Sequence, residues 1–173
     1  MALEIGGLVK PVGELFHEAR GSRETSVFRY LPQWVGAESF ALAPSMPLGG
    51  PPVNTSRRPG ARRTGVLPGP IMDAAPDSWG RRVIDAQRRI AGLPPANELE
   101  FLLAGSDAER WGALRFLDDR LCSVGNDSPG ADLASLDELA AAVARFERTG
   151  SVTPLLARFV AAASSAGGAR PKA

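Results

Sequence analysis

The first third of the chain alternates apolar and polar residues with the period of β-strands. Two short apolar runs are interrupted by glycines at 6–7 and by turn residues at 11–13. Residues 25–30 then alternate strictly, which places Phe28 and Tyr30 on one face. Because β-branched and aromatic residues at period two are typical of strands, these segments predict a three-stranded antiparallel meander.

A change of composition follows, because residues 43–70 are rich in Pro, Gly, Ser and Arg. The prolines and glycines between residues 44 and 52 oppose regular structure. Residues 57–63 carry four arginines. The pattern favours a solvated surface loop for this run, and the alternative is a basic groove that contacts phosphate.

The period then becomes helical. Pro76 suits a first helical turn and Asp77 places negative charge at the positive end of the dipole, so a helix is expected over 76–91. Its predicted buried stripe consists of Trp79, Val83, Ala86 and Ile90. Its arginines lie off that stripe and are expected to be exposed, namely Arg81, Arg82, Arg88 and Arg89.

Three further helices and a strand are predicted in the second half. A helix over 97–104 is expected to bury Leu99, Leu102 and Leu103, and a strand is expected over 111–117. After a loop at 125–130, the Ser135 to Glu138 capping box begins a helix that ends near Arg148. Its expected buried residues are Leu136, Leu139, Ala140, Val143 and Phe146. A last helix begins at Pro154, with an apolar face of Leu155, Leu156, Phe159 and Val160.

Together these elements predict an α+β fold, in which a small antiparallel β-rich part with packed helices precedes further helices. The chain has 173 residues, 44% of them hydrophobic, and a formal net charge of +1. That balance argues against bulk nucleic acid or an anionic membrane as the partner. One cysteine cannot form an internal disulfide, and the apolar stretch at 153–163 is too short to span a bilayer. We therefore expect a cytoplasmic protein.

The isolated reactive side chains of the sequence do not indicate a catalytic or metal-binding site. His17 has no metal-ligand spacing around it, so a surface histidine is expected and no metal site. Cys122 carries no nucleophile signature and is expected to be inert. Asp118 and Asp119 favour a turn rather than a carboxylate pair, and the three tryptophans, at 34, 79 and 111, favour the core. No catalytic residue is predicted.

The last residues combine small side chains with cations. Ser164, Ser165 and the Gly167-Gly168 pair precede Arg170 and Lys172. Small residues let backbone N–H groups approach a phosphate. The Walker A pattern is nevertheless missing, and composition alone favours a flexible tail.

Six segments in order change this interpretation. They are Val-Gly-Glu-Leu at 12–15, Phe-Arg-Tyr-Leu-Pro-Gln-Trp at 28–34, Ala-Pro-Ser-Met-Pro-Leu at 43–48, Ala-Pro-Asp-Ser-Trp-Gly-Arg-Arg at 75–82, the Asp107 to Leu114 segment, and Ser-Ser-Ala-Gly-Gly-Ala-Arg-Pro-Lys at 164–172. In this order they resemble HipA-type serine/threonine kinases, the toxins of HipBA toxin–antitoxin pairs. The resemblance covers only the smaller, N-terminal part of that family.

The resemblance implies a HipA-like N-terminal subdomain at 1–125 and, at 126–173, the helical start of an incomplete protein-kinase-like lobe that stops in the phosphate-binding loop. Within that loop it assigns phosphate binding to Ser165, Gly167, Gly168, Ala169 and Lys172. It makes Ser165, with Ser164 as its neighbour, the candidate for autophosphorylation.

The family's catalytic and metal-binding residues have no counterpart in residues 1–173. ATP and Mg²⁺ belong to the full-length family, and this chain alone is expected to bind neither and to be inactive. The main hypothesis is an N-terminal fragment of a HipA-like kinase toxin. The alternative is a stand-alone module that binds and neutralises a separate kinase core.

The resemblance also implies the partners, which are a HipB-like antitoxin or a separate kinase core. DNA contact is expected only through the antitoxin. A third hypothesis, direct nucleic-acid binding, rests on the arginines at 57–63 and 81–89.

Overall fold

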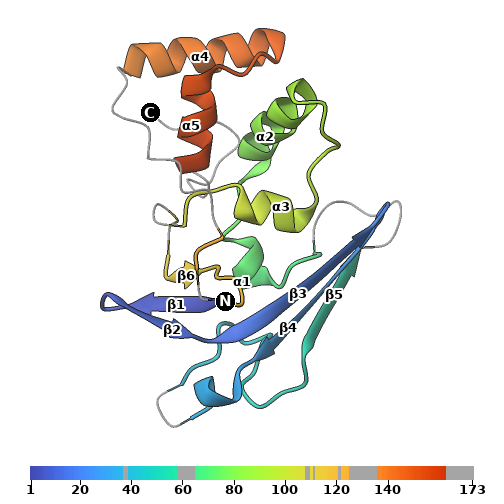
Figure 1. Cartoon of the computed structure of the whole chain (residues 1–173), viewed down its shortest axis with the longest axis vertical. Helices are drawn as coiled ribbons and strands as arrows, with labels where there is room; N and C mark the ends of the chain where they lie inside the picture. The colour runs from blue at the N-terminus through green and yellow to red at the C-terminus, as the bar shows by residue number, and fades with distance from the viewer. Residues whose placement is uncertain are drawn as a thin grey trace. The chain divides into compact units, whose positions relative to one another are not determined.

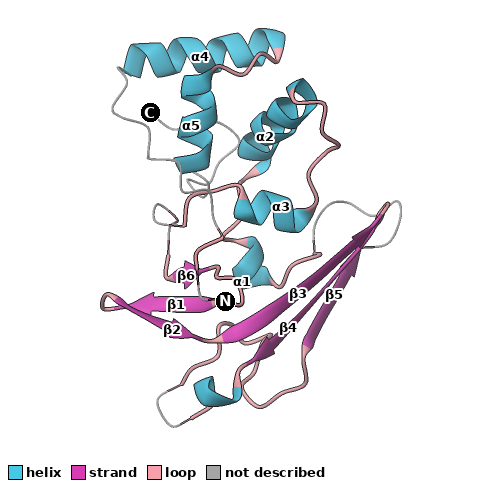
Figure 2. Ribbon diagram, in the orientation of Figure 1, coloured by secondary structure: helices cyan, strands magenta, loops and turns pink. Residues whose placement is uncertain are grey.

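The computed structural model describes residues 1–36, 39–57, 65–107, 110, 112–120, 122–124 and 136–162. The chain forms two compact units. The first comprises Met1–Ala74 with Gly112–Ser123, and the second comprises Ala75–Trp111 with Val124–Ala173. Among the described residues, the strands lie in the first unit and the longer helices in the second (Figures 1 and 2). The predicted α+β class is confirmed.

The first unit contains a small antiparallel sheet in the order β2-β1-β6. A hairpin joins β1 (Ala2–Ile5) to β2 (Leu8–Pro11), and β6 (Leu114–Arg115) pairs with the other edge of β1. The hairpin turn uses Gly6 and Gly7, both at positive φ, as a two-residue turn between twisted strands requires. Arg115 Nε lies 2.9 Å from Glu4 Oε2 and secures β6 to β1.

A second antiparallel sheet has the order β3-β4-β5 (Figure 2). Its strands are β3 (Gly13–Arg20), β4 (Arg23–Tyr30) and β5 (Val53–Arg57). This unit also contains two short helices, η1 (Pro32–Trp34) after β4 and α1 (Gly69–Met72) after β5. Its largest fully buried apolar side chains belong to Phe28, Met46, Val66, Leu67 and Ile71.

The prediction of one three-stranded meander from the first third of the chain is wrong. That region supplies two hairpins in two different sheets, and the third strand of each sheet comes from residues 53–57 or 114–115. The chain passes from one sheet to the other between the two hairpins, at Val12 and Gly13. The backbone N–H groups of both residues donate to the Met1 carbonyl there. Hydrophobic alternation identifies a strand but not its partner.

The described residues of the second unit form four helices: α2 (Ser78–Ile90), α3 (Glu98–Leu103), α4 (Leu136–Thr149) and α5 (Pro154–Ala162). Asp77 caps α2 by accepting a 2.8 Å hydrogen bond from the Gly80 N–H. Asn97 and Glu100 form a reciprocal capping box at α3. The core of this unit includes Trp79, Val83, Phe101, Phe146, Leu156 and Val160.

Helix positions were predicted better than their buried faces. Ile90 and Leu136 are both 70% exposed, although both were expected to be buried. Ala140 is exposed as well, and the buried positions of α4 are Ala142 and Phe146. Leu99 and Leu103 are half-buried, and Phe101 is fully buried instead. An apolar stripe indicates which face of a helix packs, but not how many of its turns have a partner.

The predicted boundary between 1–125 and 126–173 stays a prediction. The compact units divide the chain differently, because α2 packs on α5 and shares its core with α4.

Candidate functional site

The predicted phosphate-binding residues all lie outside the described part of the chain. These are Ser165, Gly167, Gly168, Ala169 and Lys172, and the second autophosphorylation candidate, Ser164, lies outside it as well. Of the arginine-rich run, only Arg57 is described, and Trp111 is not. The candidate sites in the described part of the chain are therefore formed by other residues.

A cluster of polar side chains lies on one face of the β3-β4-β5 sheet. His17 stands opposite Ser26, and Glu24 stands opposite Arg57, in the registers of their strand pairs. His17 Nδ1 is 2.9 Å from Ser26 Oγ, and His17 Nε2 is 3.7 Å from Glu24 Oε2. Arg57 donates to the other oxygen of the Glu24 carboxylate. We call these four residues the sheet cluster.

The expectation that His17 is a surface residue is wrong, because its side chain is only 3% exposed. A strand turns every second side chain to the same face. The covered face of this sheet thus collects one side chain from each of β3 and β5 and two from β4. The sequence did contain a sign of this buried cluster, because Glu24 and Ser26 alternate with the same period as Phe28 and therefore lie on the same face of β4.

A serine, a histidine and a glutamate within contact distance are also the parts of a nucleophile relay. Ser26, however, is only 1% exposed, and Glu24 is paired with Arg57. A substrate carbonyl cannot reach a nucleophile that is covered in this way. The cluster therefore holds three strands in register.

Replacing Ser26 tests this structural role. We expect Ser26→Ala to lower the free energy of unfolding by about 1–2 kcal/mol, because a buried hydrogen-bond partner of His17 is lost. The exposed Ser56→Ala on β5 is the matched control and should change stability by less than about 0.5 kcal/mol. Urea unfolding measures both. Equal stability of the two variants would contradict the structural role.

Arginines of α2 are paired more than the sequence suggested. Arg81 Nη1 lies 2.9 and 2.8 Å from the two carboxylate oxygens of Glu98, whose side chain is 2% exposed. Arg88 pairs with Glu100 at 3.0 Å. The expectation that all four arginines are exposed is thus wrong for these two, while Arg82 and Arg89 are exposed. Two of the four charges are compensated, and Arg82 and Arg89 remain as the exposed arginines of this helix.

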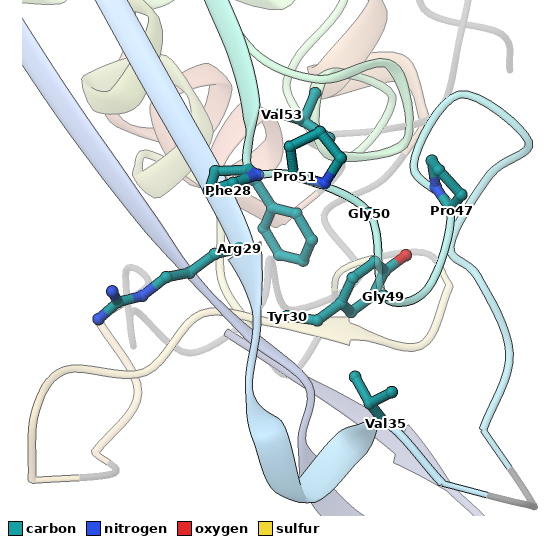
Figure 3. Close-up of a pocket in the computed structure, with 10 residues that line it drawn as sticks. Phe28, Arg29, Tyr30, Val35, Pro47, Gly49, Gly50, Pro51 and Val53 are labelled. Carbon is teal, nitrogen blue, oxygen red and sulfur yellow. The ribbon is translucent and has the colours of Figure 1, made fainter.

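A hollow of about 250 Å³ lies beside the end of β4 (Figure 3). Its walls include the Phe28 and Tyr30 rings, which meet edge to face with centroids 5.0 Å apart. Opposite them lie residues of the 47–53 segment, including Pro47, Pro51 and Val53. The Tyr30 hydroxyl donates to the Met46 carbonyl and accepts from the Leu42 N–H, both at 2.8 Å. These bonds fix the Tyr30 ring, so this wall of the hollow is preformed.

The remaining candidates add no reaction chemistry. Cys122 is exposed, and the Asp118 carboxylate accepts from the N–H groups of Arg120 and Cys122, which confirms the predicted turn. Trp79 is a core residue as predicted, whereas Trp34 is half-buried against Phe40. Within the described ranges, no three His, Cys, Asp or Glu side chains gather as metal ligands. No helix in those ranges is long and apolar enough to cross a membrane.

The described residues define an α+β protein with a β-rich unit and a helical unit. A family model described as the HipA N-terminal domain matches residues 8–117, well over half of the chain. The chain therefore belongs to the HipA N-terminal domain family. Five of the six segments noted in the sequence lie inside this match, and the sixth, at 164–172, lies beyond it. No curated protein and no solved structure gives a significant match.

Proposed function

We propose that this chain supplies the N-terminal part of a HipA-like serine/threonine kinase of a toxin–antitoxin system. The family match at residues 8–117 carries the proposal. The segment at 164–172 supports it, because its residue types suit a phosphate loop and it follows the other five segments in the order of the resemblance. In this proposal Ser165, Gly167, Gly168, Ala169 and Lys172 contact the phosphates of ATP.

Phosphoryl transfer also requires a base and metal-holding residues. The resemblance assigns none of these to residues 1–173. ATP and Mg²⁺ are therefore proposed to bind only where kinase-core residues join the loop. The chain by itself is expected to incorporate no more phosphate from ATP than its Ser165→Ala variant does.

The loop assignment is tested by phosphorylation. The full chain is incubated with ATP, Mg²⁺ and a separately produced HipA-type kinase core. Phosphosites are then identified by mass spectrometry. We expect phosphate on Ser165, or on its neighbour Ser164, and its loss in Ser164→Ala/Ser165→Ala.

Ser151→Ala, which lies outside the loop, is the matched control and should leave the phosphorylation unchanged. Absence of phosphate at both loop serines, while the same core hydrolyses ATP, would contradict the assignment.

A stand-alone module that neutralises a separate kinase core is the second candidate. It is supported by the first unit, which has its own core around Phe28, Met46 and Ile71. A protein with such a core can fold and dock as a unit. Co-purification with the kinase core and suppression of its ATP hydrolysis favour this function. Binding that leaves ATP hydrolysis by the core intact or increases it favours the first candidate, the N-terminal part of a kinase.

The proposed partners are a kinase core and a HipB-like antitoxin, with DNA reached only through the antitoxin. The charge distribution supports the indirect route. Two of the four α2 arginines are already paired with glutamates. DNA affinity is dominated by unpaired cations that neutralise phosphates.

A further inference from the structure

The hollow beside β4 has a polar edge as well as apolar walls, and this edge is set by strand register. The Leu31 N–H donates to the Val12 carbonyl at 2.9 Å, so residues 31 and 12, one step beyond the last β3-β4 pair, continue the alternation as a hydrogen-bonded position, although the Val12 N–H itself donates to Met1. Such pairs alternate with pairs that do not exchange hydrogen bonds. Tyr30, opposite Gly13, belongs to the second kind. Accordingly, Gly13 directs its own N–H and C=O to Met1.

The backbone N–H and C=O of Tyr30 therefore point to the β5 side of β4. The β4-β5 ladder ends there, because Phe28 and Val53 are its last pair. Continuing that register would place Pro51 opposite Tyr30. A proline has no N–H to donate to the Tyr30 carbonyl. Among the hydrogen bonds of the described residues, none engages either backbone group of Tyr30.

The chain turns at Gly49, whose φ is +69°, and enters β5 through Pro51 and Pro52. Figure 3 shows this segment curving away from β4, with the Phe28 and Tyr30 rings facing the space between. The hollow thus combines the backbone donor and acceptor of Tyr30 with aromatic and proline rings. The backbone of a single residue in an extended chain can pair with the Tyr30 N–H and C=O, and the side chain of that residue can pack against the rings.

We propose that this hollow binds a short extended peptide segment of a partner protein, which pairs with Tyr30 as an added strand residue and inserts one uncharged apolar side chain. The volume of about 250 Å³ is below the range of about 300–1,000 Å³ typical of small-molecule sites and suits one large side chain. Among the described residues that line it, the one charged side chain, that of Arg29, lies away from the hollow and pairs with Glu14 at 2.6 Å (Figure 3).

Two features support the role of this site in recognition. Strand addition at an open edge derives affinity from main-chain hydrogen bonds and specificity from a side-chain pocket. The Tyr30 hydroxyl bonds to Met46 and Leu42 hold one wall in place, which reduces the ordering that binding requires. The site uses no residue of the 164–172 loop, so it stands or fails independently of the proposed function.

The test is a titration of the full ¹⁵N-labelled chain with the capped pentapeptide acetyl-Ser-Ala-Phe-Ala-Ser-amide. We expect saturable shifts of the Tyr30 amide with a dissociation constant of about 1 mM or tighter. The same peptide N-methylated at its phenylalanine cannot donate to the Tyr30 carbonyl and should bind at least about tenfold more weakly.

Two substitutions complete the test. Val35→Asp places a carboxylate on the exposed rim of the hollow and should weaken binding at least about tenfold. Arg29→Ala, whose side chain points away, is the matched control and should change it less than about twofold.

Three outcomes would overturn the proposal. They are the lack of a saturable Tyr30 shift, equal binding of the methylated peptide, and equal binding by Val35→Asp.

Discussion

Replacing Arg81 by alanine is expected to lower the free energy of unfolding of the helical unit by about 3–5 kcal/mol. The Glu98 side chain is 2% exposed, and the Arg81 guanidinium is its bidentate partner. Removing the arginine leaves a buried carboxylate without that counter-charge. Arg81 Nε also donates to the Pro76 carbonyl at 2.9 Å, and its guanidinium lies 4.7 Å from the Phe101 ring centroid. The variant loses these contacts as well.

The adjacent Arg82 provides a matched control on the same helix. It is exposed, and its guanidinium lies over the Phe146 ring, 5.6 Å from the ring centroid. Arg82→Ala should therefore change stability by less than about 1 kcal/mol. Hydrogen exchange followed by mass spectrometry reads the helical unit separately from the sheets. If α2 and α3 were protected from hydrogen exchange equally well in Arg81→Ala and in Arg82→Ala, the Arg81–Glu98 ion pair would have no structural importance.

Phe28→Ala should be the most damaging single substitution in the β-rich unit, with a loss of about 3–5 kcal/mol. Phe28 is 0% exposed and is among the largest fully buried side chains. Its ring packs edge to face on Tyr30. It also covers Gly13, where an added Cβ would lie 2.5 Å from two Phe28 ring atoms. Truncation leaves a cavity on the sheet face, over Gly13 and beside the Tyr30 ring.

Phe16 on β3 is the control for Phe28, because it is also aromatic but 50% exposed. Phe16→Ala should cost less than about 1 kcal/mol, mostly through its contact with the Arg29 guanidinium, which lies 5.1 Å from its ring centroid. Urea unfolding followed by hydrogen exchange of the β4 peptides compares the two. Similar losses in both variants would show that Phe28 is not the centre of this core.

Local sequence signals located most elements of this protein. Gly150 ends its helix as predicted, with a φ of +69°. Asp77 and Asn97 were expected inside helices at 76–91 and 97–104, and they are instead the N-caps of helices that begin at Ser78 and Glu98. The strand at 25–30 and its Phe28-Tyr30 face follow from period two. The family resemblance likewise came from local segments, and five of these lie within the matched residues 8–117.

Tertiary structure decided the pairing of strands and of charges. β5 pairs with β4 across a long loop, and β6 pairs with β1 although strands β2 to β5 and helices α1 to α3 lie between them in the chain, so no local pattern shows which strands meet. The same holds for His17, which a sheet face covers, and for Arg81, which meets Glu98 across a turn. The sequence determined the elements and the family, because caps, periods and motifs are short-range. Only the fold determined which polar groups are buried together, because burial depends on partners far along the chain.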